Sequence, residues 1–154
     1  MNTNYNYMSI FNIFKKKDGV ETKLYKNGNK SYEGFIENGN RVGVWTWWKE
    51  NGQKLIEEEY NKEGMLIHLT TYEYWDNGQM KGKYNKKSDT VFDGISYKWN
   101  ENGQKVIEQE YVDGKPIKNQ AWWDNGNKMF EQVWIESVGW RGTSWNEDGS
   151  VVKK

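Results

Sequence analysis

The side chains that could do chemistry in this sequence are a single histidine, two groups of carboxylates and 10 tryptophans. His68 has no second histidine with which to bind a metal, and it stands in no motif of a catalytic triad. Its apolar neighbours Leu66, Ile67 and Leu69 are typical of a strand residue that packs rather than reacts. We predict no catalytic role for it.

Carboxylates recur at equivalent places, in residues 57–59 and again at Glu108 and Glu110. Such groups could hold a metal ion or act as a general acid and base. Their strict repetition favours a solvated strand face, with cross-strand ion pairs from Lys54 and Lys105. Because no glycine-rich phosphate loop leads into a helix, we predict no enzyme, no metal site and no cofactor.

The charge balance argues against a polyanionic partner. Lysine plus arginine and aspartate plus glutamate each number 22, so no net field draws the chain toward nucleic acid or acidic lipid. Cysteine is absent, which fits a reducing compartment, and no stretch reaches the roughly 18 apolar residues of a membrane helix. We predict a cytoplasmic protein.

The elements that must position these residues repeat along the chain. Six segments carry an aromatic or apolar residue four places before a turn glycine, with the sequences LYKNGNK, WKENGQK, YWDNGQM, WNENGQK, WWDNGNK and WNEDGS. The period is 23 to 26 residues, set by the turn glycines Gly28, Gly52, Gly78, Gly103, Gly126 and Gly149. With 16 glycines and 1 proline, the composition fits repeated turns between intact strands.

Each repeat is predicted to be a β-hairpin, because Asn-Gly or Asp-Gly supplies the two positive-φ residues of a tight type I′ turn. Side chains alternate between the two faces of a strand, which places Ile56 with Tyr60 and Ile107 with Tyr111 and turns the intervening glutamates to water. The predicted structural core consists of these four residues and the aromatics before the turns: Trp48, Tyr74, Trp99, Trp122 and Trp145.

Turn-rich clusters also end the second strand of each repeat, so every strand can pair with its sequence neighbours. We predict an all-β fold, an elongated, open and twisted antiparallel meander of about six stacked hairpins, over residues 21–154. The third repeat is irregular, with a shortened strand at Met80 to Tyr84 and a longer loop from Asn85 to Thr90. This loop is either a simple insertion or a place where function was added.

Residues 1–20 precede the array and contain a short apolar cluster followed by Lys15, Lys16 and Lys17. This order is the reverse of a secretory signal, in which the basic residues come first. Two interpretations remain open: a cap over the edge of the first strand, or a flexible or membrane-touching tail.

Five tryptophans fall outside the repeating core phase: Trp47, Trp75, Trp123, Trp134 and Trp140. On a sheet covered on only one face these rings would be exposed, and exposed rings are common interface anchors. We predict that they contact a partner. The alternative is that they pack over the second face with the stems of lysines and glutamates.

The repeat resembles the MORN-repeat-variant family, most closely over Trp48 to Tyr60 and Trp99 to Lys115, and the resemblance covers about residues 22–150. The chain departs from the family around Gly82 and over residues 137–145, where the usual turn is missing. The resemblance implies an elongated twisted meander used for protein or lipid contact. Bacterial members of the family are antitoxin or immunity proteins, and others are scaffolds or surface-associated proteins.

The leading hypothesis is a non-catalytic protein-binding module, an inhibitor of the antitoxin or immunity type that neutralises a partner protein or enzyme by occlusion. The alternatives are a carbohydrate or cell-surface binder and a scaffold or host-interaction repeat protein. Binding of single-stranded nucleic acid through stacked rings would need a basic stripe, which the balanced charge disfavours. The edges of the predicted sheet leave a dimer open.

Overall fold

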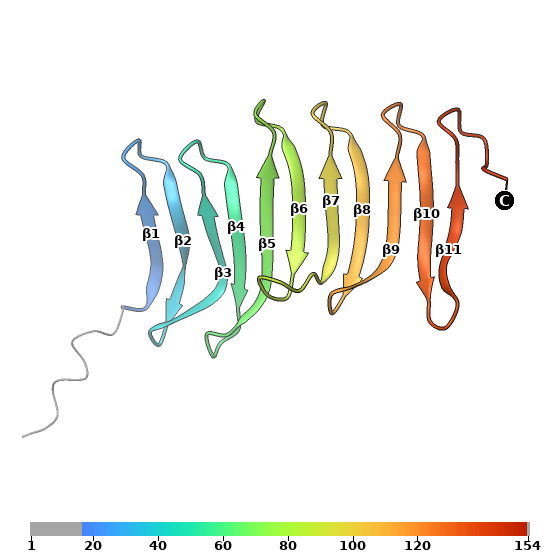
Figure 1. Cartoon of the computed structure of the whole chain (residues 1–154). Helices are drawn as coiled ribbons and strands as arrows, with labels where there is room; N and C mark the ends of the chain where they lie inside the picture. The colour runs from blue at the N-terminus through green and yellow to red at the C-terminus, as the bar shows by residue number, and fades with distance from the viewer. Residues whose placement is uncertain (1–16, 154) are drawn as a thin grey trace, which may run out of the picture.

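The structure is a computed structural model, and it describes residues 17–153. These residues form one 11-stranded sheet in which spatial order follows chain order and every neighbouring pair is antiparallel (Figure 1). The predicted all-β meander is confirmed. The strands are β1 Gly19–Leu24, β2 Lys30–Glu37, β3 Asn40–Trp48, β4 Lys54–Tyr60, β5 Leu66–Tyr74, β6 Met80–Lys86, β7 Gly94–Trp99, β8 Lys105–Val112, β9 Lys115–Trp122, β10 Lys128–Ile135 and β11 Gly139–Ser144.

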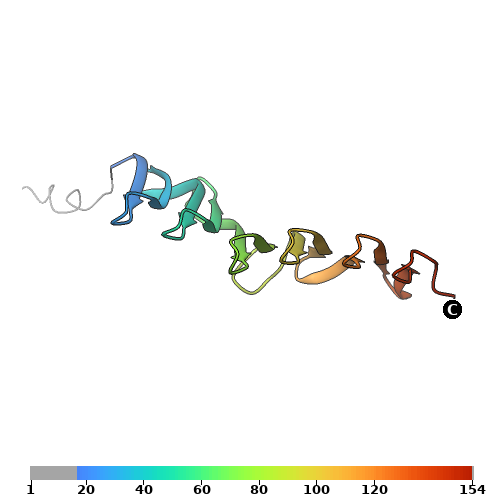
Figure 2. The ribbon, with the colours of Figure 1, turned by 90° about the horizontal axis from the view of Figure 1, so that it is seen from above.

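The sheet is a single layer. Figure 2 shows the strands in one ruffled band, without a second layer of described residues over either face. Because a single layer can bury little, the buried apolar side chains among residues 17–153 are few: Ile36, Trp45, Leu69, Tyr72 and Ala121. The expectation of one covered face is therefore wrong, and aromatic rings lie on both faces, half-buried by their neighbours.

The repeat turns share one geometry along the edge that is uppermost in Figure 1. In the second repeat the amide of Gly52 donates to the Lys49 carbonyl at 2.9 Å, and the amide of Lys49 donates to the Gln53 carbonyl at 2.7 Å. Gly52 has φ of 85°, whereas Asn51 does not have a positive φ. This is a three-residue loop, a type I turn followed by a left-handed glycine, so the predicted type I′ turn is wrong for the repeat glycines.

Type I′ geometry occurs instead at the opposite edge. Asn38 and Gly39 have φ of 52° and 80°, and Asp113 and Gly114 have φ of 48° and 81°. Two consecutive positive-φ residues define this turn type, and its twist matches that of the flanking strands. The turn between β4 and β5, at the same end of the strands, instead has the three-residue geometry of the repeat turns: the Gly64 amide donates to the Asn61 carbonyl and the Asn61 amide donates to the Met65 carbonyl, both at 3.0 Å.

Each repeat turn is followed by a β-bulge that decides which side chains share a face. Trp48 pairs with Lys54 and Trp47 pairs with Ile56, so Leu55 is an extra residue in β4. Normal alternation would place residues three apart on opposite faces, whereas a bulge brings them to the same face. The Lys-x-x-Glu spacing, which follows four of the six repeat turns, is thus an intrastrand ion pair, not the cross-strand pair that the sequence predicted.

We call the side that carries Trp48, Lys54 and Glu57 the ladder face, and the opposite side, which carries Trp45 and Trp47, the indole face. The nine residues of the predicted core do not form one core. The aromatics four residues before the turn glycines lie on the ladder face, and the isoleucine and tyrosine pairs lie on the indole face. All nine are half-buried rather than buried: Trp48, Tyr74, Trp99, Trp122, Trp145, Ile56, Tyr60, Ile107 and Tyr111.

The predicted irregularity of the third repeat is present in its pairing, because β6 pairs with β7 within the strands only at Gly82–Lys98 and Lys83–Tyr97. The strand itself is not shortened: β6 has 7 residues, the same as β4, and the loop begins after Lys86 rather than at Asn85. Gly82 lies within β6, and the ring of Tyr84 covers it. A Cβ at Gly82 would lie 2.4 Å from the Tyr84 hydroxyl. Over residues 137–145 the pairing of β10 with β11 is regular.

Of the segment 1–20, residues 1–16 lie outside the described residues, and β1 begins at Gly19. Nothing in the structure therefore bears on the cap or tail that the sequence predicts there. Within residues 17–153, no helix is long and apolar enough to cross a membrane.

Candidate functional site

The repeat turns are fastened to one another in an alternating pattern. In the first, third and fifth repeats an aromatic residue begins the turn, and its polar atom donates to a carbonyl of the following repeat. The Tyr25 hydroxyl donates to the Trp48 carbonyl, and the indole nitrogens of Trp75 and Trp123 donate to the carbonyls of Trp99 and Trp145, at 2.7, 3.0 and 3.1 Å. In each of these turns an asparagine amide also donates to a backbone carbonyl of the following repeat, a contact that we call the asparagine joint. The asparagines are Asn27, Asn77 and Asn125.

The second and fourth repeats carry Lys49 and Asn100 at the position of these aromatics. Lys49 lies 4.9 Å from the ring centre of Tyr74, and the Asn100 amide donates to the Asp124 carboxylate at 3.3 Å. Neither side chain fills the volume of an indole. The second repeat is joined to the third instead by the Gln53 amide, which donates to the Gly78 carbonyl at 2.8 Å. Asn100 therefore stands as a small residue between the two aromatic turns of Trp75 and Trp123.

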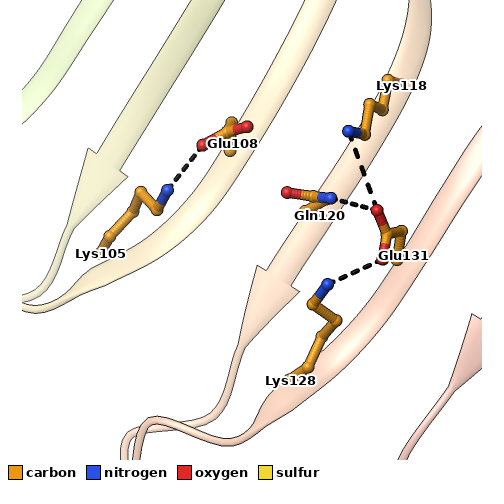
Figure 3. Close-up of polar contacts among 6 residues, drawn as sticks. All are labelled: Lys105, Glu108, Lys118, Gln120, Lys128 and Glu131. Carbon is orange, nitrogen blue, oxygen red and sulfur yellow. Dashed lines mark hydrogen bonds and ion pairs between the residues drawn. The ribbon is translucent and has the colours of Figure 1, made fainter.

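The ladder face carries alternating rings, lysines and carboxylates. Lys105 lies 4.5 Å from the ring centre of Trp122 and pairs with Glu108 at 2.6 Å (Figure 3). Glu131 is held similarly by Lys128 at 2.7 Å, and Lys118 and the Gln120 amide also reach its carboxylate from β9 (Figure 3). The carboxylates of Glu108 and Glu131 are thus neutralised locally.

The pKa values of these carboxylates are consistent with that role. Burial raises the pKa of Glu57, but hydrogen bonds from Lys54 and from the Tyr72 hydroxyl outweigh it and hold the pKa below its usual value. The hydrogen bond from Lys128 is the main cause of the lowered pKa of Glu131. A general acid needs a raised pKa, so these glutamates are placed to hold the sheet rather than to donate protons.

On the indole face, the first strands form a filled cluster around Trp45. The Trp45 ring is fully buried at 0% exposure and lies on Gly34, where a Cβ would come within 2.1 Å of the ring. Its indole nitrogen donates to the Phe35 carbonyl at 3.1 Å. The Arg41 guanidinium lies 4.5 Å from the Trp45 ring and 5.2 Å from the Trp47 ring, which closes the cluster from above.

Farther along the same face lies a groove of about 730 Å³, which is within the range of ligand pockets. Its lining includes Trp75 and Trp123, from the turns of the third and fifth repeats, with Asn100 of the fourth repeat between them. Lys98, Ile107, Ala121 and Phe130 line it from β7 to β10. The hydrogen bonds of the two indole nitrogens fix both rings before any ligand arrives.

The groove is related to which residues occupy, in β7 and β9, the positions of the two tryptophans of the filled cluster. Seven and five residues before its turn glycine, β3 has Trp45 and Trp47. The same two places hold Ser96 and Lys98 in β7 and Asn119 and Ala121 in β9. Lys98 and Ala121, at the place of Trp47, line the groove, whereas Ser96 is buried at 5% exposure and, like Asn119, does not line it.

The structure brings two of the five predicted partner-binding tryptophans together. Trp75 and Trp123 line one groove, and both are half-buried rather than exposed because their indole nitrogens are bonded to the next repeat. Trp47 is half-buried beside Trp45 in the filled cluster. Trp134 and Trp140 pack edge to face at 5.7 Å near the end of the sheet, and Trp134 is 49% exposed. Partner contact by all five stays a prediction.

Sequence reasoning missed Trp45, Lys98 and Asn100. Trp45 gives no signal by itself, since it becomes a core residue only when the register brings Gly34 beneath it. Asn100 could have been noticed as the residue that interrupts an alternation of aromatics at the start of the turns. Lys98 looks like any solvated lysine until the sheet places it between two indole walls.

The remaining candidates for chemistry are structural. His68 is a half-buried residue of β5, and its Nε2 lies 3.4 Å from the Thr70 hydroxyl. Within residues 17–153, no group of three or more histidine, aspartate or glutamate side chains could hold a metal ion. The groove is therefore the feature of the described chain best suited to bind another molecule.

The fold defines this chain, over residues 17–153, as a single-layer β-hairpin repeat protein. No family model matches the sequence, and no curated protein matches it. A solved structure that it resembles, from the crystal structure of accessory secretory protein 1, 2 and 3 in Streptococcus pneumoniae, is 16% identical with a TM-score of 0.23. The match covers 94% of this chain and 22% of that chain. A likeness this low shows nothing about function, and membership of the MORN-repeat-variant family stays a prediction.

Proposed function

We propose that this chain is a non-catalytic module that binds another protein through the indole face, with the groove between Trp75 and Trp123 as its anchoring site. The observation that carries this proposal is the groove itself, a hollow between two indoles on an otherwise flat sheet. Fully desolvated pockets that receive an aromatic or large apolar side chain dominate the energy of many interfaces.

The groove walls are ordered in advance. Each indole is held by a hydrogen bond to the next repeat, at 3.0 Å for Trp75 and 3.1 Å for Trp123. A ligand that enters the groove need not immobilise these side chains, which would otherwise cost about 0.5 to 1.5 kcal/mol for each rotamer-rich side chain. Preorganisation of this kind supports a binding role.

We infer further that binding inhibits the partner by covering its working surface, in the manner of a cytoplasmic antitoxin or immunity protein. An elongated sheet presents a long, rigid face, so occlusion needs no catalytic group on this chain. A scaffold or host-interaction role would use the same face without inhibition. An assay of the partner's own activity separates these roles.

Carbohydrate binding is the second candidate. The ladder face carries half-exposed rings at every second strand, which places Trp48, Trp99, Trp122 and Trp145 in one row. Lysines lie over several of these rings, at 5.7 Å for Trp48, 4.5 Å for Trp122 and 5.8 Å for Trp145. Because a sugar stacks on an open ring face, the lysines weigh against this candidate.

The test is affinity capture from cells, with partner identification and titration of the purified partner. We expect the wild-type chain to bind one protein and a Trp75→Ala, Trp123→Ala variant to bind it at least tenfold more weakly. Trp48→Ala is the matched control, because Trp48 lies on the ladder face and does not line the groove. The variants must show the wild-type circular dichroism spectrum.

Equal binding by the double variant and the wild type would overturn the groove as the anchoring site. Binding of purified oligosaccharides, lost when Trp48 and Trp145 of the ladder face are replaced by alanine, would establish the carbohydrate candidate instead. An unchanged activity of the bound partner would remove inhibition while leaving the binding role in place.

A dimer through the sheet edges stays a prediction. Among residues 17–153 no strand pairs with the outer edge of β1, which carries exposed Val20 and Leu24, whereas at β11 the Val152 amide donates to the Ser144 carbonyl and covers part of the edge. Sedimentation at several concentrations measures whether two copies pair.

A further inference from the structure

Two turns of the array share the sequence Glu-Asn-Gly-Gln-Lys, over residues 50–54 and residues 101–105. We propose that the second of these turns is a modification site, at which Asn102 loses its side-chain amide without the help of an enzyme. Asn51, in the first turn, is protected from the same reaction. The site lies in a repeat turn and does not depend on the proposed binding role.

An Asn-Gly pair can react within itself. The glycine amide nitrogen attacks the asparagine Cγ, so that a new C–N bond forms and the Cγ–Nδ2 bond breaks. The displaced nitrogen takes the proton of the glycine amide and leaves as ammonia. Water then opens the resulting succinimide ring at one of its two carbonyls, which yields aspartate or isoaspartate. Glycine favours the attack because it has no Cβ that would hinder it.

Five repeat turns contain an Asn-Gly pair, and their backbones are alike. In all five the glycine amide donates to the carbonyl of the residue that begins the turn, at 2.9 to 3.1 Å. The glycine φ angles lie between 78° and 88°. Asn38-Gly39 belongs to a different turn type, with a positive φ at the asparagine. A difference among the five turns must come from their asparagine side chains: Asn27, Asn51, Asn77, Asn102 and Asn125.

Four of these five side chains are held at both ends. The Oδ1 atom of Asn51 accepts from the Gln53 backbone amide at 3.1 Å, and its Nδ2 donates to the Gln53 side chain at 2.9 Å. In the other three, Oδ1 accepts from the backbone amide two residues on, and Nδ2 donates to a carbonyl of the next repeat: Asn27, Asn77 and Asn125. Rotation of the side chain toward the glycine nitrogen breaks both hydrogen bonds.

The Asn102 side chain is held at neither end within residues 17–153. Asn100, which begins the turn, takes its place. Its Oδ1 accepts from the backbone amides of Asn102 and Gln104, at 3.1 and 3.0 Å. The turn that begins with Asn61 has the same arrangement, in which Oδ1 accepts from the amides two and four residues on. An asparagine at the start of the turn thus leaves the one before glycine free.

The residue before the shared sequence therefore separates the two turns. Lys49 begins the turn of Asn51, and its ammonium cannot accept the Gln53 amide. The Asn102 side chain breaks no hydrogen bond when it rotates, whereas the Asn51 side chain breaks two. Each such bond is worth a factor of about 2 to 12 in an equilibrium. We expect Asn102 to react at least about fivefold faster than Asn51.

The aspartate product fits the turn. In the sixth repeat Asp148 stands before the glycine, and its carboxylate accepts from the Ser150 amide at 2.8 Å although Asn146 begins that turn. A charged acceptor is stronger than a neutral one. The aspartate form of residue 102 should therefore take the Gln104 amide. Each event adds one negative charge to a chain whose formal net charge is zero.

The experiment incubates the full chain at neutral pH and physiological temperature. Peptide mass spectrometry follows each Asn-Gly pair and resolves aspartate from isoaspartate. In concentrated urea, where the turns are lost, Asn51 and Asn102 should convert at equal rates because their local sequences are identical. In the folded chain Asn102 should be the faster of the two by the factor given above. Equal rates in the folded chain, or no conversion of Asn102, would overturn the inference.

Reciprocal substitutions locate the cause. Asn100→Lys gives the fourth turn the start of the second, and it should slow the conversion of Asn102 to the rate of Asn51. Lys49→Asn does the reverse and should raise the rate of Asn51 to that of Asn102 in the wild type. The rates of Asn27 and Asn125 should keep their wild-type values in both variants, which shows that the fold is intact. An unchanged rate of Asn102 in Asn100→Lys, with the fold intact, would overturn the inference.

Discussion

Two regions of the indole face share one backbone plan and differ in what fills it. At β3, Trp45 and Trp47 occupy the positions seven and five residues before the turn glycine, and Arg41 closes over them. At β7 the same positions hold Ser96, which is buried at 5% exposure, and Lys98, which lines the groove. The comparison teaches that turns and bulges build the scaffold, while the residue five places before the turn glycine, Trp47 in β3, Lys98 in β7 and Ala121 in β9, separates the filled region from the groove.

The largest effect should come from emptying the filled region. We expect Trp45→Ala to lower the free energy of unfolding by about 3 to 5 kcal/mol, because a fully buried indole leaves a cavity above Gly34. Urea unfolding followed by circular dichroism measures the change. Lys98→Ala, at the open region, should change it by less than about 0.5 kcal/mol. Similar losses in the two variants would contradict the division into filled and open regions.

The turns should respond alike in both regions, because the same asparagine joint occurs in each. The Asn27 amide donates to the Glu50 carbonyl at 2.9 Å, and the Asn125 amide donates to the Glu147 carbonyl at 2.7 Å. Asn27→Asp and Asn125→Asp each replace that donor with an acceptor, and we expect each to cost about 1 to 2 kcal/mol of unfolding free energy.

Asn102→Asp is the control for these joints. Asn102 stands at the equivalent place before Gly103, and its side chain makes no hydrogen bond within the described residues. We expect this variant to unfold at the wild-type urea concentration. A loss as large as that of Asn125→Asp would show that the asparagine matters for its own turn rather than for the joint.

The ladder face gives a finer comparison. Glu57 accepts from both Lys54 and the Tyr72 hydroxyl, whereas Glu108 pairs with Lys105. We expect Glu57→Gln to cost about 1 kcal/mol and Glu108→Gln less than about 0.5 kcal/mol. The pKa of Glu57 is lowered on folding, so its contribution is complete above its usual pKa of 4.5 and is lost as the pH falls below that value. The cost of Glu57→Gln should therefore disappear in acid; a cost that is constant with pH would contradict this assignment.

The smallest effect concerns tyrosines, and it appears only in alkali. Burial and a hydrogen bond to Glu73 raise the pKa of Tyr84 to about 12, and Arg41 opposes the rise in pKa that burial and Glu58 cause at Tyr60. A raised folded pKa gives stability that is complete below pH 10 and is lost as the pH rises through about 12. In an absorbance titration, Tyr84→Phe should remove one late-ionising tyrosine and Tyr60→Phe an earlier one. The reverse order would show that Arg41 does not influence Tyr60.

Much of the fold could be predicted from the sequence because the turns are local. The glycine period gives the number of hairpins, and Asn-Gly pairs allow few alternatives to a hairpin. The exact turn type could not be predicted, since Asn51-Gly52 and Asn38-Gly39 look alike and adopt different geometries. The difference arises from the bulge after Gly52, which depends on how many residues separate the turn from the first cross-strand pair.

The candidate site could be predicted only in part. Trp75 and Trp123 stand out as aromatics beside the repeating phase, and the sequence alone selected both. It could not separate them from Trp47, which joins the filled cluster, because one residue of register decides which neighbours a ring meets. Lys98 and Asn100 carry no motif and gain significance from their neighbours in other repeats.

By itself, the sequence determined that this chain is a meander of hairpins, because period and turn residues act over a few bonds. The tertiary structure decided which rings share a face, where a lysine three residues from a glutamate meets it, and where the sheet is hollow. These three features depend on the bulge and on the cross-strand register, which bring together residues about 24 positions apart. The sequence of a single repeat therefore does not predict them.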